Sequence, residues 1–292
     1  MPLRQITIIG TGLIGGSFAL ALKKRGFKGR IIGCDRPPVT QQAKKKGAID
    51  AGLADPIEAI KDSQVVMLAT PIGAILDLIG RVGPALSDTT LLTDVGSTKS
   101  AIVAQAQKTF GKDWCRRFLG GHPMAGKEEA GVEFANPDLF QGTTWFVTPE
   151  DQQISDSLGQ EFVRWIKKIG ARVATIDAEA HDQLCAWISH LPQMISTALA
   201  AELVDQFSNN GSLLESGGRA LREMTRISAS PYSMWRDIAL TNKANIREAL
   251  LKLEQRLAHL RENLDNRELE SEFERAHRLR KFLPRGCGGT EN

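Results

Sequence analysis

Short runs of apolar and β-branched residues alternate with helical stretches over the first 176 residues. The predicted strands cover residues 6–9, 30–35, 64–68, 91–94, 144–148 and 171–176. A helix is expected from Leu13 to Leu22, because small and apolar residues fill that stretch and Gly26 follows as a helix-ending glycine. Strands and helices that alternate in this way predict βαβ units and a mostly parallel, buried sheet.

The pattern changes near Asp177. From there to about Leu279, apolar positions recur with helical spacing, glycines and prolines interrupt them, and no strong strand signal is present. We therefore predict an α/β fold with a Rossmann-type parallel-sheet domain at residues 1–176 and an all-α C-terminal domain at residues 177–282. The Gly-rich segment 283–292 is expected to be a disordered tail.

One apolar stripe in the helical half repeats at alternating spacings of four and three residues. It consists of Ile246, Leu250, Leu253, Leu257, Leu260 and Leu264. Such spacing places all six side chains along one side of a helix, as in a coiled-coil seam. Packing within one subunit is one explanation. A homodimer interface is favoured because the stripe is long and narrow.

Composition and charge narrow the class of protein. With 292 residues, 42% hydrophobic, 24% charged and a net charge of +3, the chain is typical of a globular protein. Basic runs at residues 23–25 and 44–46 have no interleaved aromatic residues, so no nucleic-acid partner is expected. Because no apolar run spans a bilayer and no signal-peptide pattern is present, a cytoplasmic protein without membrane contact is expected.

The four cysteines, Cys34, Cys115, Cys185 and Cys287, are scattered along the chain without a CxxC pair. No pairing of these cysteines with a nearby histidine, at the spacing of metal ligands, is expected. We interpret them as reduced thiols and expect neither a disulfide framework nor a metal site.

Gly10, Gly12 and Gly15 form a GxGxxG motif that follows a predicted strand and opens a predicted helix. Gly10 permits the tight turn, Gly12 lets the backbone approach a pyrophosphate, and Gly15 lets the helix pack closely on the strand. The amides at the start of the helix, at Leu13 and Ile14, would face the phosphates at the positive end of the helix dipole.

Asp35 lies at the end of the second predicted strand, twenty residues after Gly15. A carboxylate at this position accepts hydrogen bonds from ribose hydroxyls and repels a 2′-phosphate, which favours NAD. Arg36 can pair with a phosphate, so NADP is kept as an alternative cofactor. A Gly-rich turn without a ligand is the other alternative, but strand, helix and acidic residue in register favour a dinucleotide site.

A second group of chemical residues follows later strands. Residues 94–99 (DVGSTK) come at the carboxyl end of a predicted strand, the edge where open α/β sheets bind ligands. Ser97 is a candidate there for chemistry or for a helix N-cap. His122 stands between glycines and a proline, and a neutral imidazole suits a base that takes a hydroxyl proton near pH 7.

Taken together, these residues resemble the prephenate and arogenate dehydrogenases of tyrosine biosynthesis. The shared motifs lie at residues 10–17, 69–71, 94–99, 120–126, 181–182, 189–192, 225–227 and 234–238. They cover most of the chain in the family's order, which makes the resemblance specific. It adds Thr70 and Pro71 to the expected cofactor residues and implies that the nicotinamide of NAD accepts a hydride.

The resemblance implies an oxidative decarboxylation, in which hydride leaves a cyclohexadienol ring, the ring carboxylate departs as carbon dioxide and the ring becomes aromatic. By similarity, His122 takes the 4-hydroxyl proton, and Ser97 hydrogen-bonds His122 or that hydroxyl. Arg226 would bind a substrate carboxylate, which matches its planar fork. His190, beside a kink expected at Pro192, would line a cleft between the domains.

The substrate is expected to be prephenate, with arogenate or both substrates as alternatives. Arogenate carries an ammonium group that an acidic residue would favour, and Glu128 and Glu223 are the candidates. Gln193 stands where some relatives have another histidine. The resemblance also places Trp235 at the substrate and allows inhibition by tyrosine at the active site.

Two other classes of protein are alternatives. A β-hydroxyacid dehydrogenase also joins a Rossmann domain to helices, but Lys243, the nearest candidate for its catalytic lysine, lacks the surrounding motif. A non-enzymatic nucleotide sensor would have no need for Ser97, His122 and Arg226 together.

Overall fold

The computed structural model describes residues 2–126, 129–149, 157–207, 211–279 and 281–282. Glu128, Cys287 and the tail at 283–292 therefore lie outside the described residues. The chain divides into two compact units, Met1–Asn245 and Ile246–Asn292. This division falls inside a helix and does not test the domain boundary expected near Asp177, which stays a prediction.

The first unit contains one eight-stranded sheet, in agreement with the predicted α/β fold. Its strands are β1 (Gln5–Ile9), β2 (Arg30–Cys34), β3 (Ala51–Leu53), β4 (Val65–Leu68), β5 (Leu91–Asp94), β6 (Phe118–Pro123), β7 (Thr144–Thr148) and β8 (Arg172–Thr175). They lie in the order β3-β2-β1-β4-β5-β6-β7-β8, and all neighbouring pairs are parallel except β6 and β7.

All six predicted strands are present, but β3 and β6 were not predicted. β3 has only three residues, too few for a periodic pattern. β6 reads FLGGHP, and its two glycines and terminal proline are typical of a loop. His122 therefore lies on a buried strand.

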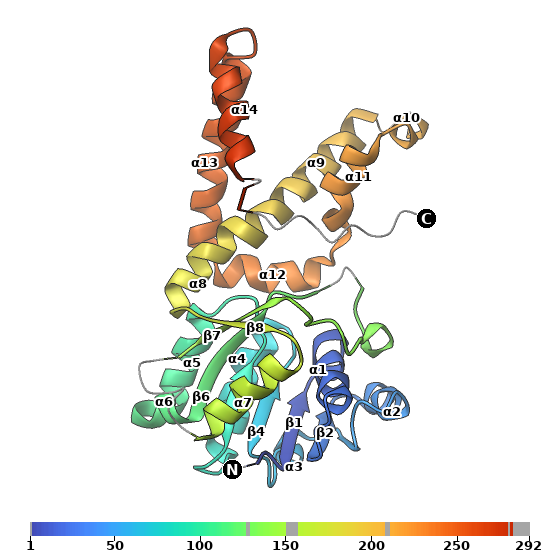
Figure 1. The fold of residues 1–292 in the computed structure, drawn as a ribbon, viewed down its shortest axis with the longest axis vertical. Helices are drawn as coiled ribbons and strands as arrows, with labels where there is room; N and C mark the ends of the chain where they lie inside the picture. Colours follow the sequence, from blue (N-terminus) through green and yellow to red (C-terminus); the bar gives the residue numbers. More distant parts are fainter. Residues whose placement is uncertain (1, 127–128, 150–156, 208–210, 280, 283–292) are drawn as a thin grey trace. The chain divides into compact units, whose positions relative to one another are not determined.

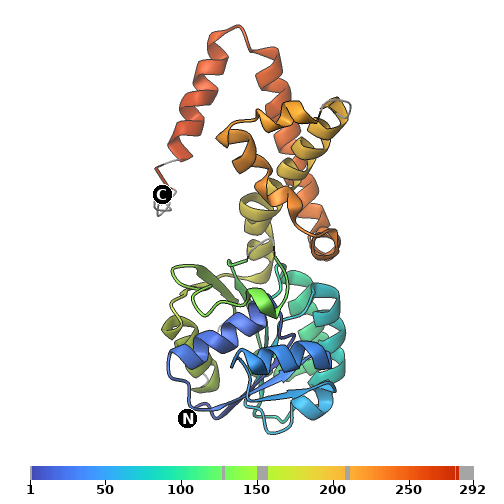
Figure 2. The same cartoon turned by 90° about the vertical axis from the view of Figure 1, so that its right-hand side faces the viewer.

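Helices cover both faces of the sheet (Figures 1 and 2). They are α1 (Leu13–Lys24), α2 (Pro37–Lys45), α3 (Pro56–Ala59), α4 (Ile72–Val82), α5 (Ser100–Phe110), α6 (Trp114–Arg117) and α7 (Ser157–Lys168), with short 3₁₀ turns at Gly83–Ala85, Gly111–Asp113 and Val132–Phe134. The chain moves outward in one direction from β1 and in the other from β4. Right-handed crossovers then place α1 and α2 on one face and α4 and α5 on the other.

Aromatic side chains fill the core between α1, α7 and the sheet. Phe18 of α1 lies 5.7 Å from the Trp145 ring of β7 and 6.1 Å from the Phe162 ring of α7. Phe140 packs on the same Trp145 ring at 5.2 Å. All four side chains are almost fully buried. Each contributes a large apolar area, so this cluster anchors the antiparallel end of the sheet to the nucleotide-binding half.

The rest of the chain is helical, and no strand occurs in its described part from residue 177 onward, as predicted. The elements are α8 (Ala178–Cys185), a π-helix (Ala186–His190), α9 (Leu191–Phe207), α10 (Ser212–Glu215), α11 (Arg219–Thr225), a 3₁₀ helix (Arg226–Ala229), α12 (Tyr232–Thr241), α13 (Lys243–Glu262) and α14 (Arg267–Leu279). No helix among the described residues is both long enough and apolar enough to cross a membrane.

The predicted distortion at Pro192 takes the form of the π-helix. Proline has no amide hydrogen and cannot continue the regular ladder of hydrogen bonds. The five residues Ala186–His190 adopt the wider π turn directly before α9, in which Pro192 is the second residue. His190, the last residue of the π turn, is fully buried. Such single π turns are common at functional sites.

The apolar stripe predicted from residue 246 to 264 lies mainly on α13, with Leu264 beyond the end of that helix. Within the second unit, an ion pair of 2.7 Å between Arg256 and Glu272 joins α13 to α14. Leu257 is 55% exposed and Leu264 is 67% exposed in the single chain. Internal packing therefore does not account for the whole stripe.

Candidate active site

The parallel strands β1, β2, β4, β5 and β6 end at one edge of the sheet. Gly10, Asp35 and Thr70 follow the first three of these strands, Ser97 follows β5, and His122 lies near the end of β6. The topology therefore brings the candidate cofactor and catalytic residues to the edge where open α/β sheets bind ligands.

The three glycines of the GxGxxG motif have different surroundings. Gly10 has a φ of +95°, and a Cβ there would lie 2.4 Å from the Ala69 carbonyl oxygen. A Cβ at Gly15 would lie 2.0 Å from the carbonyl oxygen of Gly10, whereas Gly12 has nothing within 4 Å. Gly10 and Gly15 thus permit the turn and the close helix contact, and Gly12 leaves open space beside the backbone.

Asp35 is held by the backbone at the end of β2. Its Oδ2 accepts a hydrogen bond of 2.8 Å from the Thr11 amide, and its Oδ1 accepts one of 2.8 Å from the Arg36 amide. A carboxylate has about four acceptor positions, so the side chain can still accept hydrogen bonds from ribose hydroxyls. The Arg36 residue itself is exposed.

Helix α1 begins without a side-chain cap, unlike helix α4 at the same edge. Among the described residues no side chain caps the helix at its N-cap residue Gly12, so the amides of Leu13 and Ile14 have no partner within the helix. By contrast, the Asp237 carboxylate accepts from the Gly73 amide in the first turn of α4, two residues after Pro71. Free amides at the start of a helix are donors for a phosphate.

Thr70, two residues after β4, supplies another unused group. Its Oγ1 is buried and has no hydrogen-bond partner in the part of the chain that the structure describes. Its methyl group would lie 2.9 Å from a Cβ at Gly10, so the side chain borders the glycine turn. An open glycine, an uncapped helix and an unpartnered hydroxyl together fit a dinucleotide.

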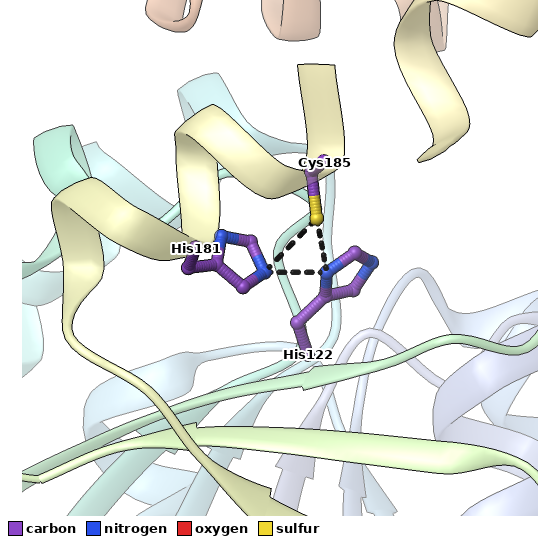
Figure 3. A group of neighbouring side chains, drawn as sticks. All are labelled: His122, His181 and Cys185. Atoms are coloured by element: carbon purple, nitrogen blue, oxygen red, sulfur yellow. Dashed lines mark hydrogen bonds between the residues drawn. The ribbon is translucent and has the colours of Figure 1, made fainter. Parts of the chain in front are cut away.

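His122 belongs to a buried cluster with His181 and Cys185 of α8 (Figure 3). Nδ1 of His122 lies 2.9 Å from Nε2 of His181. Sγ of Cys185 lies 3.4 Å from the same His181 nitrogen and 4.0 Å from Nδ1 of His122. The sequence interpretation, which placed no histidine near a cysteine, is wrong here, because His181 and Cys185 are four residues apart on one helix.

Asp182 fixes the other side of His181. Its Oδ1 lies 2.9 Å from Nδ1 of His181, and its two oxygens accept hydrogen bonds from the amides of Lys99 and Ser100 at 2.7 and 2.9 Å. Burial opposes ionisation of Asp182, but the hydrogen bonds from His181 and the two amides outweigh it and lower the pKa of the carboxyl. An ionised Asp182 therefore faces His181.

This arrangement determines which nitrogen of His122 is basic. The carboxylate of Asp182 can only accept, so the hydrogen of neutral His181 is on Nδ1 and its Nε2 is an acceptor. His122 then donates from Nδ1 to His181, and Nε2 of His122 keeps its lone pair. Burial is the main cause that holds the pKa of His122 well below 6.5, and the positive charge of the Lys99 ammonium adds to it. His122 is therefore a neutral base at pH 7.

Lys99 and Asp94 hold the strand that carries His122. Hydrogen-bonded pairing of β5 with β6 ends at Thr93 and Leu119. Beyond that point Oδ1 of Asp94 accepts a hydrogen bond of 3.1 Å from the Gly121 amide, and the Lys99 ammonium donates to the Gly121 carbonyl at 2.8 Å. Lys99 also forms a fully buried ion pair with Asp94. Side chains therefore replace the backbone ladder next to His122.

Ser97 does not cap a helix. Helix α5 begins at Ser100, its N-cap residue is Lys99, and its first amides are bonded to Asp182. The N-cap alternative for Ser97 is therefore wrong. Ser97 is half-buried in the turn between Asp94 and α5, and in the described part of the chain no hydrogen bond joins it to His122.

Two buried donors lie further along the helical part. The Asn242 amide donates a hydrogen bond of 3.1 Å to Nδ1 of His190, which leaves the hydrogen of a neutral His190 on Nε2. Burial lowers the pKa of His190 to about 4, so the ring is neutral. Nε2 of His190 and Nε1 of Trp235 are both buried and have no hydrogen-bond partner among the described residues, and the two rings lie 5.9 Å apart. Unpartnered buried donors indicate a place for a ligand acceptor.

Arg226 is the first residue of the 3₁₀ helix Arg226–Ala229 and is exposed. Gln193 of α9 donates a hydrogen bond of 2.9 Å to the carbonyl of the next residue, Ile227, and so ties this segment to the helix that follows His190. Glu223 is exposed, and its partner is Arg219 at 2.7 Å. Glu128 lies outside the described residues.

The sequence interpretation missed the partners of His122. His181 and Asp182 were noted as a motif, but Lys99, Asp94 and Cys185 were given no role. The spacing of His181 and Cys185 on a helix was the one available signal. Their contact with His122 is made between segments 59 residues apart, so no local pattern contains it.

Comparison with known proteins relates both halves of the chain to one family. Residues 18–175 match the family described as prephenate dehydrogenase, nucleotide-binding domain, and residues 177–279 match prephenate dehydrogenase, dimerization domain. The chain is 30% identical to prephenate dehydrogenase of Lactococcus lactis, over 99% of this chain and 80% of that protein. It is 33% identical to prephenate dehydrogenase of Bacillus subtilis, over 92% of this chain and 72% of that protein.

Solved structures agree with this relationship. Prephenate dehydrogenase of Aquifex aeolicus, in complex with hydroxyphenyl propionate and NAD⁺, has a TM-score of 0.85 and 32% identity and covers 97% of each chain. Arogenate dehydrogenase of Synechocystis has a TM-score of 0.77 and 27% identity, covering 96% of this chain and 100% of that one. The chain belongs to the prephenate dehydrogenase family.

Proposed function

We propose that this protein catalyses the NAD-dependent oxidative decarboxylation of prephenate to 4-hydroxyphenylpyruvate. The observation that carries the proposal is the chain of contacts from Asp182 through His181 to His122, which leaves a neutral Nε2 as a base at the ligand-binding edge of the sheet. This base stands in a chain that belongs to the prephenate dehydrogenase family.

In the proposed reaction, Nε2 of His122 takes the proton of the 4-hydroxyl group. The ring carboxylate leaves as carbon dioxide and the ring becomes aromatic, so the residues have mainly to position the substrate and accept this proton. Ser97 is assigned to the same hydroxyl, since its turn lies at the same edge as His122. NAD, when bound, supplies the acceptor for the hydride.

We assign the cofactor to the glycine turn, the uncapped start of α1, Thr70 and Asp35. The Aquifex aeolicus relative binds NAD⁺, and Asp35 at the end of β2 favours the unphosphorylated ribose. NADP is the alternative cofactor, with the exposed Arg36 as the group that would meet its phosphate.

Replacing Asp35 with serine is expected to lower the ratio of kcat/KM for NAD to that for NADP by about tenfold or more. The variant loses charge-assisted hydrogen bonds to the ribose and the repulsion of a 2′-phosphate. Steady-state kinetics with both cofactors measures the ratio. Asp88→Ser, at an exposed surface position, is the control. An unchanged ratio in Asp35→Ser would show that this carboxylate does not contact the ribose.

We assign Arg226, His190 and Trp235 to the substrate. The guanidinium of Arg226 matches a carboxylate, and the unpartnered hydrogens on Nε2 of His190 and Nε1 of Trp235 are donors for anionic or carbonyl oxygens. Glu223 is already paired with Arg219, which makes it a weaker partner for the ammonium of arogenate. We therefore favour prephenate, with arogenate, the substrate named for the Synechocystis relative, as the alternative.

Arg226→Ala is expected to raise the KM for prephenate about tenfold or more with a smaller change in kcat. A hydrogen-bonded charge contact contributes about 1.5–3 kcal/mol, and its loss affects mainly the binding of the charged group. Arg116→Ala, at another exposed arginine, controls for the change of net charge. If the KM of Arg226→Ala equals that of the wild type, Arg226 does not bind the substrate.

We further propose that the chain forms a homodimer through its C-terminal helices, and that tyrosine can compete at the active site. Residues 177–279 match the family's dimerization domain, and the apolar stripe on α13 leaves Leu257 exposed in the single chain. The product-like shape of tyrosine supports competition with the substrate.

The direct test measures reduction of the cofactor through the absorbance of the reduced nicotinamide. Purified protein would be given NAD or NADP with prephenate and, separately, with arogenate. Turnover of prephenate with NAD far above the other combinations is expected. No turnover of either substrate while NAD still binds would refute the proposed reaction.

A further inference from the structure

We propose that His122, His181 and Cys185 form a binding site for a thiophilic divalent cation, with Zn²⁺ as the preferred ion. The three candidate ligand atoms are Nδ1 of His122, Nε2 of His181 and Sγ of Cys185. They all lie within 4.8 Å of one another, and all three residues are buried (Figure 3).

The spacing of these atoms is close to that of a zinc site. With Zn–N bonds of about 2.0–2.1 Å and a Zn–S bond of about 2.3 Å, tetrahedral ligands lie about 3.3 Å apart for two nitrogens and about 3.6 Å apart for nitrogen and sulfur. The separations in the structure are 2.9 Å between the nitrogens and 3.4 and 4.0 Å from sulfur to nitrogen. Shifts of a few tenths of an ångström would therefore admit the ion.

The orientation of His181 also suits a metal. Its Nδ1 is bonded to Asp182, so the lone pair of Nε2 points toward His122 and Cys185. A carboxylate behind the ligating histidine is the usual support of zinc-bound imidazoles. His181 and Cys185 come from one side of α8 because they are four residues apart.

The donor set and the surrounding charges select the ion. One sulfur and two imidazole nitrogens suit Zn²⁺, whereas Mg²⁺ and Ca²⁺ require oxygen ligands. The ammonium of Lys99 is bound to Asp94, which compensates its charge. On binding, the metal–sulfur bond replaces the S–H bond of Cys185 and the proton is released to solvent; the resulting thiolate and the adjacent Asp182 offset the charge of the ion.

Occupation of this site would change His122 in a defined way. A neutral imidazole that binds a metal through Nδ1 carries its hydrogen on Nε2. The nitrogen assigned as the base would then be a donor, unable to accept the substrate proton. The ion is therefore an inhibitor that leaves the cofactor cradle untouched. This consequence rests on the proposed function of His122, whereas the binding site itself does not.

Binding is tested first, without substrate or cofactor. Co²⁺ added to the metal-free, full-length protein should give the visible absorption bands of a tetrahedral site and a thiolate-to-cobalt charge-transfer band. One equivalent of Zn²⁺ per chain should then displace the bound Co²⁺. Cys185→Ser should remove the charge-transfer band and weaken Zn²⁺ binding at least about tenfold. Substitution of a residue that only supports a zinc ligand already weakens binding by about this factor. Cys115→Ser, at a half-buried thiol on α6, should behave like the wild type.

His122→Asn serves as a second variant that removes a different ligand, and thermal unfolding confirms that each variant is folded. Absence of a thiolate band in the wild type, or equal Zn²⁺ affinity in the wild type, Cys185→Ser and His122→Asn, would overturn the site.

Inhibition is then measured, with each rate taken relative to the same variant's metal-free rate. Zn²⁺ should inhibit the wild type reversibly, with recovery on addition of a chelator, and Cys185→Ser should need at least about tenfold more Zn²⁺. Binding without inhibition would support the site and overturn the assignment of Nε2 as the blocked base.

Discussion

Replacing His122 with asparagine should lower kcat by about 10²-fold or more. The side-chain amide of asparagine can still donate a hydrogen bond to His181, as Nδ1 of His122 does, but it cannot take up a proton at neutral pH. The Asp182–His181 pair would remain, so the loss would reflect the missing base and not a missing contact. Steady-state turnover with saturating prephenate and NAD measures the change.

His259→Asn is the matched control, because it makes the same substitution at a histidine of α13 outside the proposed site. Its turnover should equal that of the wild type. Thermal unfolding of both variants separates a chemical effect from loss of structure. Wild-type turnover in His122→Asn would remove His122 from the reaction.

The pH dependence of the wild type gives a second readout of the same base. Burial is the main cause that holds the pKa of His122 below 6.5. A base works in its unprotonated form, so activity is retained above its pKa and is lost as the pH falls through it. The acid limb of kcat/KM should therefore lie below pH 6.5. A limb above that value would contradict a buried, neutral His122.

Much of the sheet and of the cofactor cradle could be predicted, because local features encode them. The GxGxxG motif lies where a β-branched run stops and a helix starts, and Asp35 follows at the end of the next run. Each of these signals depends on neighbouring residues only. The absence of strands after residue 177 in the described part of the chain was predicted from helical spacing for the same reason.

The surroundings of His122 could not be predicted, because they depend on contacts between distant segments. β6 contains glycines and proline, and it is a strand only because β5 and β7 flank it. Gly121 shows why glycine is needed there, since a Cβ would lie 2.7 Å from the Asp94 carbonyl oxygen. The residue type that hides the strand from sequence analysis is the one that lets it fit beside β5.

Asp182 illustrates the same limit at the other end of the site. It caps α5 from a different part of the chain and also orients His181. A cap supplied by a neighbouring residue leaves a sequence pattern, but a cap from more than 80 residues away does not. The N-cap role for Ser97 assumes that a serine just before a helix caps it, but Asp182 occupies that role from a distant part of the chain.

Lys99→Met should lower the free energy of unfolding by about 3–5 kcal/mol, the cost of removing one partner of a buried ion pair. Both side chains of the Lys99–Asp94 pair are fully buried. Methionine fills much of the volume of the lysine stem, so the variant mainly removes the ammonium. Asp94 would keep its hydrogen bonds from the amides of Gly96 and Gly121, but its charge would have no counter-ion.

Urea unfolding measures the free energy of unfolding of Lys99→Met and of Lys24→Met. Lys24→Met makes the same substitution at the surface and controls for the loss of a lysine as such. Lys24 pairs with Asp138 on the surface, where both side chains are nearly half exposed, and exposed pairs of this kind contribute little to stability. Lys99→Met should also lower turnover at temperatures where it is folded, because the Gly121 carbonyl next to His122 loses its donor. If the two variants differ by less than about 1 kcal/mol, the buried pair does not stabilise the end of β6. Equal turnover of folded Lys99→Met and wild type would show that the position of His122 depends on the backbone of β6 and β7 alone.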